Sequence, residues 1–305
     1  MQEIGLIGLG RMGANMARRL SRAGLKLAVC NRTASVAHAL AAEETNLRAV
    51  DSYAELLSSL PSPRIVWLML PAGGATESAL QELFGQLAPG DLLVDGANAY
   101  YQDSMRHAED LAAKGVEFVD AGVSGGVWGL DNGYALMLGG APQSVARLRP
   151  LIEALAPAPD KGWVHCGPAG SGHFAKMVHN GIEYGMMQAL AEGLALMKSK
   201  QEFDFDLAEV SEAWRHGSVV RSWLLDLTAE VLKQDQDLEA IQPHVADSGE
   251  GRWTALEAIN QKVPAPVMSL ALMMRYASQG NNDYPAKLLA MMRNAFGGHK
   301  VEPAK

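Results

Sequence analysis

IGLIGLGRMG, residues 4–13, is the stretch that decides the fold. The apolar run Ile4–Ile7 predicts a buried strand, and three glycines follow it where a helix begins. In that position the glycines predict a dinucleotide-binding turn. One makes the tight turn, one lets the backbone approach the pyrophosphate, and one packs the helix on the strand. The alternative is a glycine-rich turn without a ligand. The residues assigned to the dinucleotide are Gly8, Gly10, Arg11, Met12 and Gly13.

The second strand indicates which nicotinamide dinucleotide is bound. An NAD site usually has Asp or Glu at the end of this strand, where the carboxylate accepts hydrogen bonds from the ribose. Here the strand ends in Asn31, Arg32 and Thr33, so no carboxylate repels a 2′-phosphate. Arg32 can pair with that phosphate and stack on adenine, and Asn31 and Thr33 can donate further hydrogen bonds. We therefore expect NADP. If Arg32 is only a solvated residue at a helix start, the protein uses NAD as well.

The first half of the chain alternates short apolar runs with amphipathic stretches. Runs that end in Gly, Pro, Asn or Asp, with helices between them, predict a parallel, doubly wound sheet of the Rossmann type. One further helix is expected from Ala141-Pro142 to a break before Pro157. The predicted strands are Ile4–Ile7, Lys26–Cys30, Ile65–Leu70, Leu92–Asp95, Glu117–Asp120, Ala135–Leu138 and Trp163–His165.

After Gly172 the pattern changes, because Met, Ala and Leu dominate and the apolar period stays helical. We expect an NADP-binding Rossmann-type domain at residues 1–170 and an all-helical substrate and dimerisation domain at residues 171–305. The helices predicted in the second domain are Gly172 to about Lys200, Leu207–Arg215, Ser222–Lys233, Thr254–Lys262, Pro266–Ser278 and Ala286–Ala295.

Composition excludes several classes of protein. The 305 residues are 48% hydrophobic and 20% charged, an ordinary balance for a folded globular chain. The formal charge of 26 − 34 = −8 argues against nucleic acid as a partner. We expect no membrane segment, no targeting segment and no metal. Cys30 and Cys166 have neither metal nor redox spacing, so we expect a reducing cytoplasm and no disulfide.

The segment GSGHFAKMVHNGIEY, residues 170–184, is the most informative for chemistry. At 100° per residue, its large polar side chains fall within an arc of about 140° on one helix face. Met177 and Ile182 are expected to face a core on the other side. That face predicts a lined cleft with a base and an acid, whereas the alternative is a solvated Lys–Glu pair. The residues on the polar face are Lys176, His179, Asn180, Glu183 and Tyr184.

Three motifs resemble those of decarboxylating 6-phosphogluconate dehydrogenase. They are Asn31-Arg32-Thr33, Val123-Ser124-Gly125-Gly126 and KMVHNGIEY at residues 176–184. The resemblance extends from Ile4 to His299, and the chain is similar to the short-chain subgroup of the family. It implies oxidation and decarboxylation of 6-phosphogluconate to ribulose 5-phosphate in the pentose phosphate pathway or in gluconate catabolism.

The same resemblance implies the two catalytic roles. Lys176 matches the family's general base, which takes the proton of the substrate 3-hydroxyl and then polarises the resulting ketone. Glu183 matches the acid that protonates the enediol after carbon dioxide has left. The β-keto acid loses carbon dioxide without a metal once its carbonyl has a cationic partner.

The resemblance also implies the substrate contacts. Glycines after a strand let backbone N–H groups approach an anion, and that loop matches the site of the sugar-acid carboxylate. Asn98 matches a residue that touches both substrate and nicotinamide. For Asn98 a simple turn is the alternative, and for the loop a structural turn. The implied substrate residues are Asn98, Ser124, Gly125, Gly126, His179, Asn180 and Tyr184.

Recognition of the substrate phosphate requires cations. Arg275 matches a phosphate ligand of the family, although a lone Arg is more often surface charge. Arg293 and His299 match tail residues that reach the neighbouring subunit's site, which implies a homo-oligomer, dimer or tetramer; a frayed polar tail is the alternative. The match is incomplete at Ser248 and Glu250, where longer members have a Lys and a Thr, respectively, that contact the substrate.

Two other functions are consistent with parts of the pattern. A β-hydroxyacid dehydrogenase of the hydroxyisobutyrate type shares the glycine-rich start, the Ser124 loop and the lysine. That group usually has Asn-Asn where His179-Asn180 stands and needs no acid at Glu183, because it releases no carbon dioxide. A non-catalytic NADP sensor would retain the fold, but it is expected to have lost Lys176 or Glu183.

Overall fold

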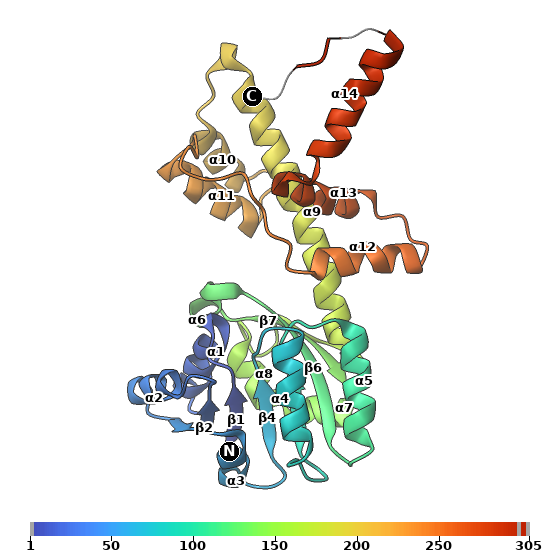
Figure 1. The fold of residues 1–305 in the computed structure, drawn as a ribbon. Helices are drawn as coiled ribbons and strands as arrows, with labels where there is room; N and C mark the ends of the chain where they lie inside the picture. The colour runs from blue at the N-terminus through green and yellow to red at the C-terminus, as the bar shows by residue number, and fades with distance from the viewer. Residues whose placement is uncertain (1–2, 298–299, 303–305) are drawn as a thin grey trace. The chain divides into compact units, whose positions relative to one another are not determined.

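The computed structural model describes residues 3–297 and 300–302 of the chain. The described residues form two compact units that divide between Met177 and Val178 (Figure 1). No helix in the described part of the chain combines the length and apolar content needed to cross a membrane.

A mixed sheet forms the centre of the first unit. Within residues 3–177, eight strands pair in the order β3-β2-β1-β4-β5-β6-β7-β8. All pairs are parallel except β6 with β7, which run antiparallel. The strands are β1 Ile4–Ile7, β2 Leu27–Cys30, β3 Leu47–Val50, β4 Ile65–Leu68, β5 Leu92–Asp95, β6 Glu117–Ser124, β7 Ala135–Gly140 and β8 Trp163–Gly167.

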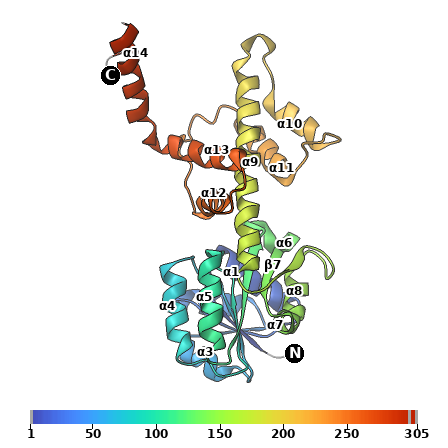
Figure 2. The same cartoon turned by 90° about the vertical axis from the view of Figure 1, so that its right-hand side faces the viewer.

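Helices cover both faces of this sheet, as Figure 2 shows in a nearly edge-on view. One hydrophobic cluster joins the sheet to α1, α2 and α8 through residues such as Leu20, Leu40 and Ile152. A second cluster joins the opposite face to α3, α4 and α5 through residues such as Leu56 and Leu83. The helical segments are α1 Arg11–Arg22, α2 Ala34–Glu43, α3 Tyr53–Ser59, α4 Gly74–Phe84, α5 Tyr101–Ala112, η1 Gly126–Trp128, α6 Gly129–Asn132, α7 Pro142–Arg147 and α8 Arg149–Leu155.

The Rossmann-type prediction is confirmed, with several differences of detail. The edge strand β3 was not predicted, because LRAV lacks a continuous apolar run and is buried only at its ends. The sheet is not wholly parallel, since β7 pairs antiparallel with β6. That pairing extends β6 to Ser124, four residues beyond the predicted end at Asp120. The single helix predicted after Ala141 is two, which divide at Leu148.

The second unit is helical, as predicted. The helices α10 and α11 begin after Asp206 and Ser222, whose side-chain oxygens accept backbone N–H groups of the first turn. Helix α12 begins four residues before the predicted Thr254. The elements are α9 Ser171–Ser199, of which residues 171–177 belong to the first unit, η2 Gln201–Phe203, α10 Leu207–Arg215, α11 Trp223–Gln234, α12 Glu250–Asn260, α13 Pro266–Tyr276, η3 Ala277–Asn281 and α14 Asp283–Gly297.

This unit has a small buried core of its own. The cluster of buried residues there contains Leu194, Leu207, Ala208 and Leu232. Many large apolar side chains are instead exposed, among them Ile182, which was expected in a core and is 51% exposed. Others are Leu196, Ile259, Val267 and Leu270. An apolar surface of this extent is typical of a chain that packs against another one.

Candidate active site

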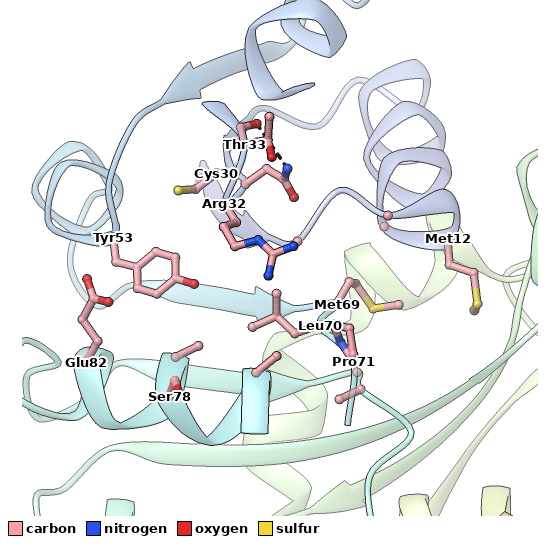
Figure 3. A pocket seen from close by; sticks show the side chains of 18 of the residues that line it. Met12, Cys30, Arg32, Thr33, Tyr53, Met69, Leu70, Pro71, Ser78 and Glu82 are labelled. Atoms are coloured by element: carbon pink, nitrogen blue, oxygen red, sulfur yellow. Dashed lines mark hydrogen bonds between the residues drawn. The ribbon is translucent and has the colours of Figure 1, made fainter. Parts of the chain in front are cut away.

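A cavity of about 830 Å³ opens at the carboxyl ends of the parallel strands in the first unit (Figure 3). Its wall is made by the segments that follow β1, β2, β3, β4 and β5 and by helix α4. The strand order reverses between β1 and β4, and ligands of doubly wound sheets bind at such a switch point. The cavity is within the range of ~300–1,000 Å³ that is usual for ligand sites.

The three glycines of the turn have three different environments. Gly8 has a φ of +96°, and a side chain there would lie 2.5 Å from the Met69 carbonyl oxygen. A Cβ on Gly13 would lie 2.0 Å from the carbonyl oxygen of Gly8, so α1 packs directly on the turn. Gly10 precedes the first residue of α1 and faces open space, with no heavy atom within 4 Å of an added Cβ. The turn therefore has the shape that a diphosphate requires, and it leaves an approach at Gly10.

Asn31 and Arg32, which follow β2, differ in their contacts. The Asn31 side chain accepts a hydrogen bond from Leu9 N–H at 3.0 Å and donates to the Thr33 carbonyl at 3.2 Å, so it holds the glycine turn. Arg32 is exposed, and its guanidinium has no hydrogen-bond or ion-pair partner among the described residues. Figure 3 shows the guanidinium pointing into the cavity. Arg32 is therefore the cation available for a phosphate, whereas Asn31 is largely used within the protein.

Sequence reasoning missed the opposite wall of the cavity. Tyr53 and Glu82 line it together with Asp51, and Figure 3 shows the Tyr53 hydroxyl directed inward. Burial, together with the carboxylates of Asp51, Glu55 and Glu82, raises the pKa of the Cys30 thiol to about 11. This end of the cavity thus carries negative charge as well as Arg32. No motif signals these residues, because they come from α3 and α4 and only the fold brings them together.

Asn98 links the cavity to the loop predicted for the substrate carboxylate. Its amide nitrogen donates to the Val123 carbonyl at 3.0 Å, and its amide oxygen accepts from Val123 N–H at 2.8 Å. Asn98 has a φ of +51°, a left-handed conformation that Asn tolerates in turns. The pairing fixes the end of β6, where Ser124 is the last strand residue and Gly125 follows with a φ of +141°.

Gly126 leaves space beside this loop. It has a φ of +53°, and nothing lies within 4 Å of an added Cβ. The backbone there is accessible, while Gly125 is packed against the ring of Tyr134. The loop can therefore present N–H groups to an anion, as predicted from its glycines.

Lys176 lies near the start of α9 and is 6% exposed. Its side-chain stem packs on β6, because a Cβ on Gly122 would lie 2.5 Å from Lys176 Cβ. One turn earlier, the buried His173 ring forms a hydrogen bond from Nδ1 to Ser104 Oγ at 2.7 Å. His173 and Gly170 also donate backbone N–H groups to the carboxylate of Asp120. None of these supporting residues was identified from the sequence.

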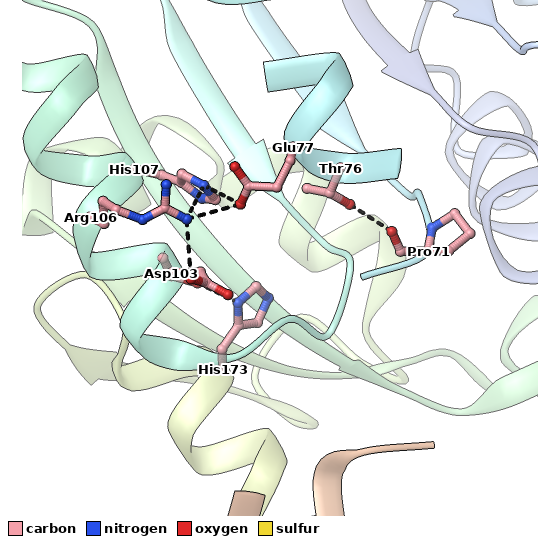
Figure 4. Close-up of polar contacts among 8 residues, drawn as sticks. Pro71, Thr76, Glu77, Asp103, Arg106, His107 and His173 are labelled. Carbon is pink, nitrogen blue, oxygen red and sulfur yellow. Dashed lines mark hydrogen bonds and ion pairs between the residues drawn. The ribbon is translucent and has the colours of Figure 1, made fainter. Parts of the chain in front are cut away.

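A polar network fastens α4 to α5 in the same unit (Figure 4). Glu77 accepts hydrogen bonds from Arg106 at 3.0 Å and pairs with His107 Nε2 at 2.8 Å. Arg106 also pairs with Asp103 at 3.1 Å. The network holds the helix that carries Ser104, and Figure 4 shows His173 beside that helix.

Three of the predicted residues meet at the beginning of the second unit. His179 Nδ1 lies 3.0 Å from the Asn180 amide oxygen and 3.9 Å from a carboxylate oxygen of Glu183. Both His179 and Glu183 are partly exposed. A histidine beside a carboxylate is suited to hold or pass a proton.

Tyr184 and Arg275 form another group in that unit. The Arg275 guanidinium stacks on the Tyr184 ring at 3.4 Å, and Arg275 also donates to the Ala246 carbonyl at 2.9 Å. The Tyr184 hydroxyl lies 3.0 Å from Ser248 Oγ, and Ser248 in turn pairs with Glu250. The two positions that depart from the longer relatives are therefore next to the predicted substrate residue Tyr184.

The tail residues are less informative. Arg293 lies on α14 and is exposed. His299 lies outside the described residues.

Comparison with known proteins identifies the family. Residues 3–167 match the model of the NAD-binding domain of 6-phosphogluconate dehydrogenase, and residues 172–284 match the model of its C-terminal domain. The chain belongs to the 6-phosphogluconate dehydrogenase family. A relative in this family, the NAD⁺-dependent decarboxylating 6-phosphogluconate dehydrogenase of Haloferax volcanii, is 38% identical over 98% of both chains.

Solved structures agree with this membership. The 6-phosphogluconate dehydrogenase of Plasmodium falciparum, described with its cofactor NADP⁺ and its substrate 6-phosphogluconate, has a TM-score of 0.84 and 31% identity. The match covers 99% of this chain and 67% of that one. A 3-hydroxyisobutyrate dehydrogenase of Mycobacterium tuberculosis has a TM-score of 0.73 at 22% identity, covering 93% of this chain and 94% of that one. That second likeness shows a shared fold.

Gly10→Ala tests the turn. Since a Cβ there meets no protein atom, the variant should keep the parent's melting temperature. It should weaken NADPH binding about tenfold or more, because the methyl group occupies the approach of the pyrophosphate. Titration of nucleotide fluorescence measures the affinity. Gly85→Ala, also in open space but outside the cavity, is the matched control. Equal affinities of the two variants would contradict the assignment.

Proposed function

We propose that the protein oxidises and decarboxylates 6-phosphogluconate to ribulose 5-phosphate and carbon dioxide, with reduction of NADP or NAD. One observation carries the proposal: a buried Lys176 lies near the start of α9, and Glu183 follows about two turns later on the same uninterrupted helix. Family membership and the NADP⁺- and 6-phosphogluconate-binding relative support it.

Lys176 is the general base for oxidation. It must be neutral to accept the proton of the substrate 3-hydroxyl, and its side chain is buried on β6. A nicotinamide dinucleotide held by the residues of the first unit's cavity would supply the acceptor for the hydride from C3. Lys176 is left as an ammonium ion beside the new ketone oxygen, and the substrate is then a β-keto acid.

Decarboxylation follows from that charge. The bond between C1 and C2 breaks, its electron pair moves toward the ketone, and C1 leaves as carbon dioxide. The Lys176 ammonium stabilises the negative charge on the enediolate oxygen and returns its proton there. Glu183 then protonates the carbon that lost carbon dioxide, which becomes C1 of ribulose 5-phosphate, while neutral Lys176 takes the proton back from the enediol oxygen as the ketone re-forms. His179 Nδ1 lies 3.9 Å from Glu183 and can return a proton to the Glu183 carboxylate.

Other residues hold the substrate. We assign Ser124, Gly125 and Gly126 to the carboxylate, and Asn98 keeps that loop in place through Val123. Substrate hydroxyls are assigned to Asn180 and Tyr184. Arg275 retains guanidinium donors for the phosphate, because its observed contacts use the ring face, one N–H group toward the Ala246 carbonyl and one toward the Met187 sulfur at 4.0 Å.

The second unit supports a homo-oligomer. In a homo-oligomer, a second copy of the chain buries the exposed apolar residues of this unit. In that assembly Arg293 and His299 complete the partner subunit's site. The chain's Cys30 and Cys166 are unpaired, which is consistent with the cytoplasm.

The direct test follows NADP and NAD reduction with 6-phosphogluconate and traps the released carbon dioxide. Equal amounts of reduced nucleotide and carbon dioxide are expected. Lys176→Ala and Glu183→Gln should each lower kcat by about 10²- to 10⁴-fold, the usual contribution of acid–base groups. Lys198→Ala and Glu192→Gln, exposed on the same helix, should leave it unchanged. Reduction without carbon dioxide would favour the β-hydroxyacid dehydrogenase alternative, and persistent turnover in Lys176→Ala would refute the assigned base.

Arg32→Ala tests the choice of nucleotide. Loss of a charge-assisted contact of ~1.5 kcal/mol or more should raise the KM for NADP about tenfold and leave the KM for NAD nearly unchanged. Steady-state kinetics with both nucleotides measures the ratio. Arg22→Ala, which removes an exposed pair with Glu44, is the control. An equal rise in both KM values would show that Arg32 does not contact the 2′-phosphate.

Hybrid assembly tests the contribution of the tail. Lys176→Ala and Arg293→Ala chains should each be nearly inactive alone, and co-refolding them should restore activity. Each hybrid would have one site with Lys176 from one chain and Arg293 from the other. Light scattering should show a dimer or larger species throughout. A mixture no more active than its two parts would indicate that Arg293 does not act across subunits.

A further inference from the structure

We propose that Asp120 is a positioning residue that fixes Lys176 against the sheet by capping the first turn of α9 from strand β6. This inference rests on the proposed function, in which Lys176 is the general base. Asp120 is fully buried, and each of its carboxylate oxygens accepts one backbone N–H group. Gly170 donates to Oδ1 at 2.6 Å, and His173 donates to Oδ2 at 2.7 Å.

The cap comes from a distant strand rather than from the helix's own sequence. Most helices are capped by a Ser, Thr, Asp or Asn that directly precedes the first turn. Gly170 stands at that position here and has no side chain, so the capping group is 50 residues away in sequence. A local cap would stabilise α9 and leave it free to shift over the sheet. A cap supplied by β6 ties the rotation and height of α9 to that strand.

Glycines bring the helix into direct contact with the strands. A Cβ on Gly172 would lie 2.6 Å from the Asp120 carbonyl oxygen and 2.5 Å from that of Met137 in β7. A Cβ on Gly139 would lie 2.5 Å from an Asp120 carboxylate oxygen. Two residues beyond Asp120, Gly122 leaves room for the stem of Lys176. The capping carboxylate and the surface under Lys176 therefore belong to one short segment of β6.

Two further contacts hold the same turn from the side. His173 pairs with Ser104 of α5 at 2.7 Å, and the Phe174 ring meets Tyr101 edge-on at a centroid distance of 5.1 Å. Both anchors come one turn or less before Lys176. They prevent rotation of α9 about its axis, which would move the Lys176 amine even if the cap remained.

Burying a carboxylate costs free energy of folding unless hydrogen bonds replace the lost hydration. Burial raises the pKa of Asp120, and the His173 ring and the two N–H groups oppose that rise. An apolar side chain would cost less free energy to bury at this position. What the carboxylate adds is the pair of hydrogen bonds to the start of α9. Stability of the sheet alone does not explain it, because β6 is already paired on both sides.

The chain offers a matched control in Asp91. Its buried carboxylate also accepts two backbone N–H groups, from Arg64 at 2.7 Å and from Ala88 at 2.9 Å, and it pairs in addition with the Arg64 guanidinium at 3.1 Å. It precedes β5, so it lies at the opposite end of the strands from the cavity. Asp120→Asn and Asp91→Asn both replace one of the two acceptor oxygens by an amide, and both should lower the melting temperature.

The experiment compares these two variants with 6-phosphogluconate that carries deuterium at C3. Asp120→Asn should lower kcat about tenfold or more, since small displacements of a catalytic group have large effects on rate. Its deuterium isotope effect should rise because bond breaking becomes slower, and the Kd for NADPH should stay unchanged. Asp91→Asn should keep the parent's kcat and isotope effect.

The outcomes separate this inference from the proposed function. A parent enzyme that does not turn over 6-phosphogluconate would overturn the proposed function. If the parent turns over 6-phosphogluconate, and Asp120→Asn and Asp91→Asn have equal kcat values and equal isotope effects, the proposed role of Asp120 is overturned. If Asp120→Asn does not fold, Ser104→Ala decides, because it loosens the same turn without removing a charge. A lower kcat with a larger isotope effect supports the proposal, and an unchanged isotope effect overturns it.

Discussion

Two backbone N–H groups at the start of α9 donate to one buried carboxylate on β6, and this contact connects the sheet to the proposed chemistry. The glycines at positions 122, 139 and 172 let the helix approach close enough for it to form. Lys176 follows on the next turn, with its stem on the same strand. The sheet, rather than a loop, therefore fixes the position of the Lys176 amine. A rigid support of this kind is what a positioned base requires.

The same strand also serves the dinucleotide side. Asn98, at the rim of the cavity, forms two hydrogen bonds with Val123 near the end of β6. Strand β6 therefore carries the cap of α9, the seat of Lys176 and the loop proposed for the substrate carboxylate. A change in β6 is expected to affect oxidation more than dinucleotide binding, because the glycine turn of α1 is built separately around Gly8 and Gly13.

The sequence predicts the elements better than the contacts. Glycine spacing and apolar runs identified the Rossmann-type half, and helical periodicity identified the second half. The edge strand β3 escaped because it is only half buried. Pattern also cannot reveal Asp120, which precedes α9 by 50 residues, nor Tyr53 and Glu82, which only the fold brings to the cavity. Asn31 and Asn98 both line the cavity and stay predicted ligand contacts, and the sequence could not reveal that their amides also bond to the backbone.

The most direct measurement is a crystal structure of the enzyme with 6-phosphogluconate and NADP. It should place the Lys176 amine within about 3 Å of the substrate 3-hydroxyl, the distance that proton transfer requires, while the Asp120 carboxylate still accepts both N–H groups. The Glu183 carboxyl group should contact the same substrate molecule, near its C2 atom. A substrate bound away from the Lys176 amine, or a start of α9 detached from β6, would contradict the account.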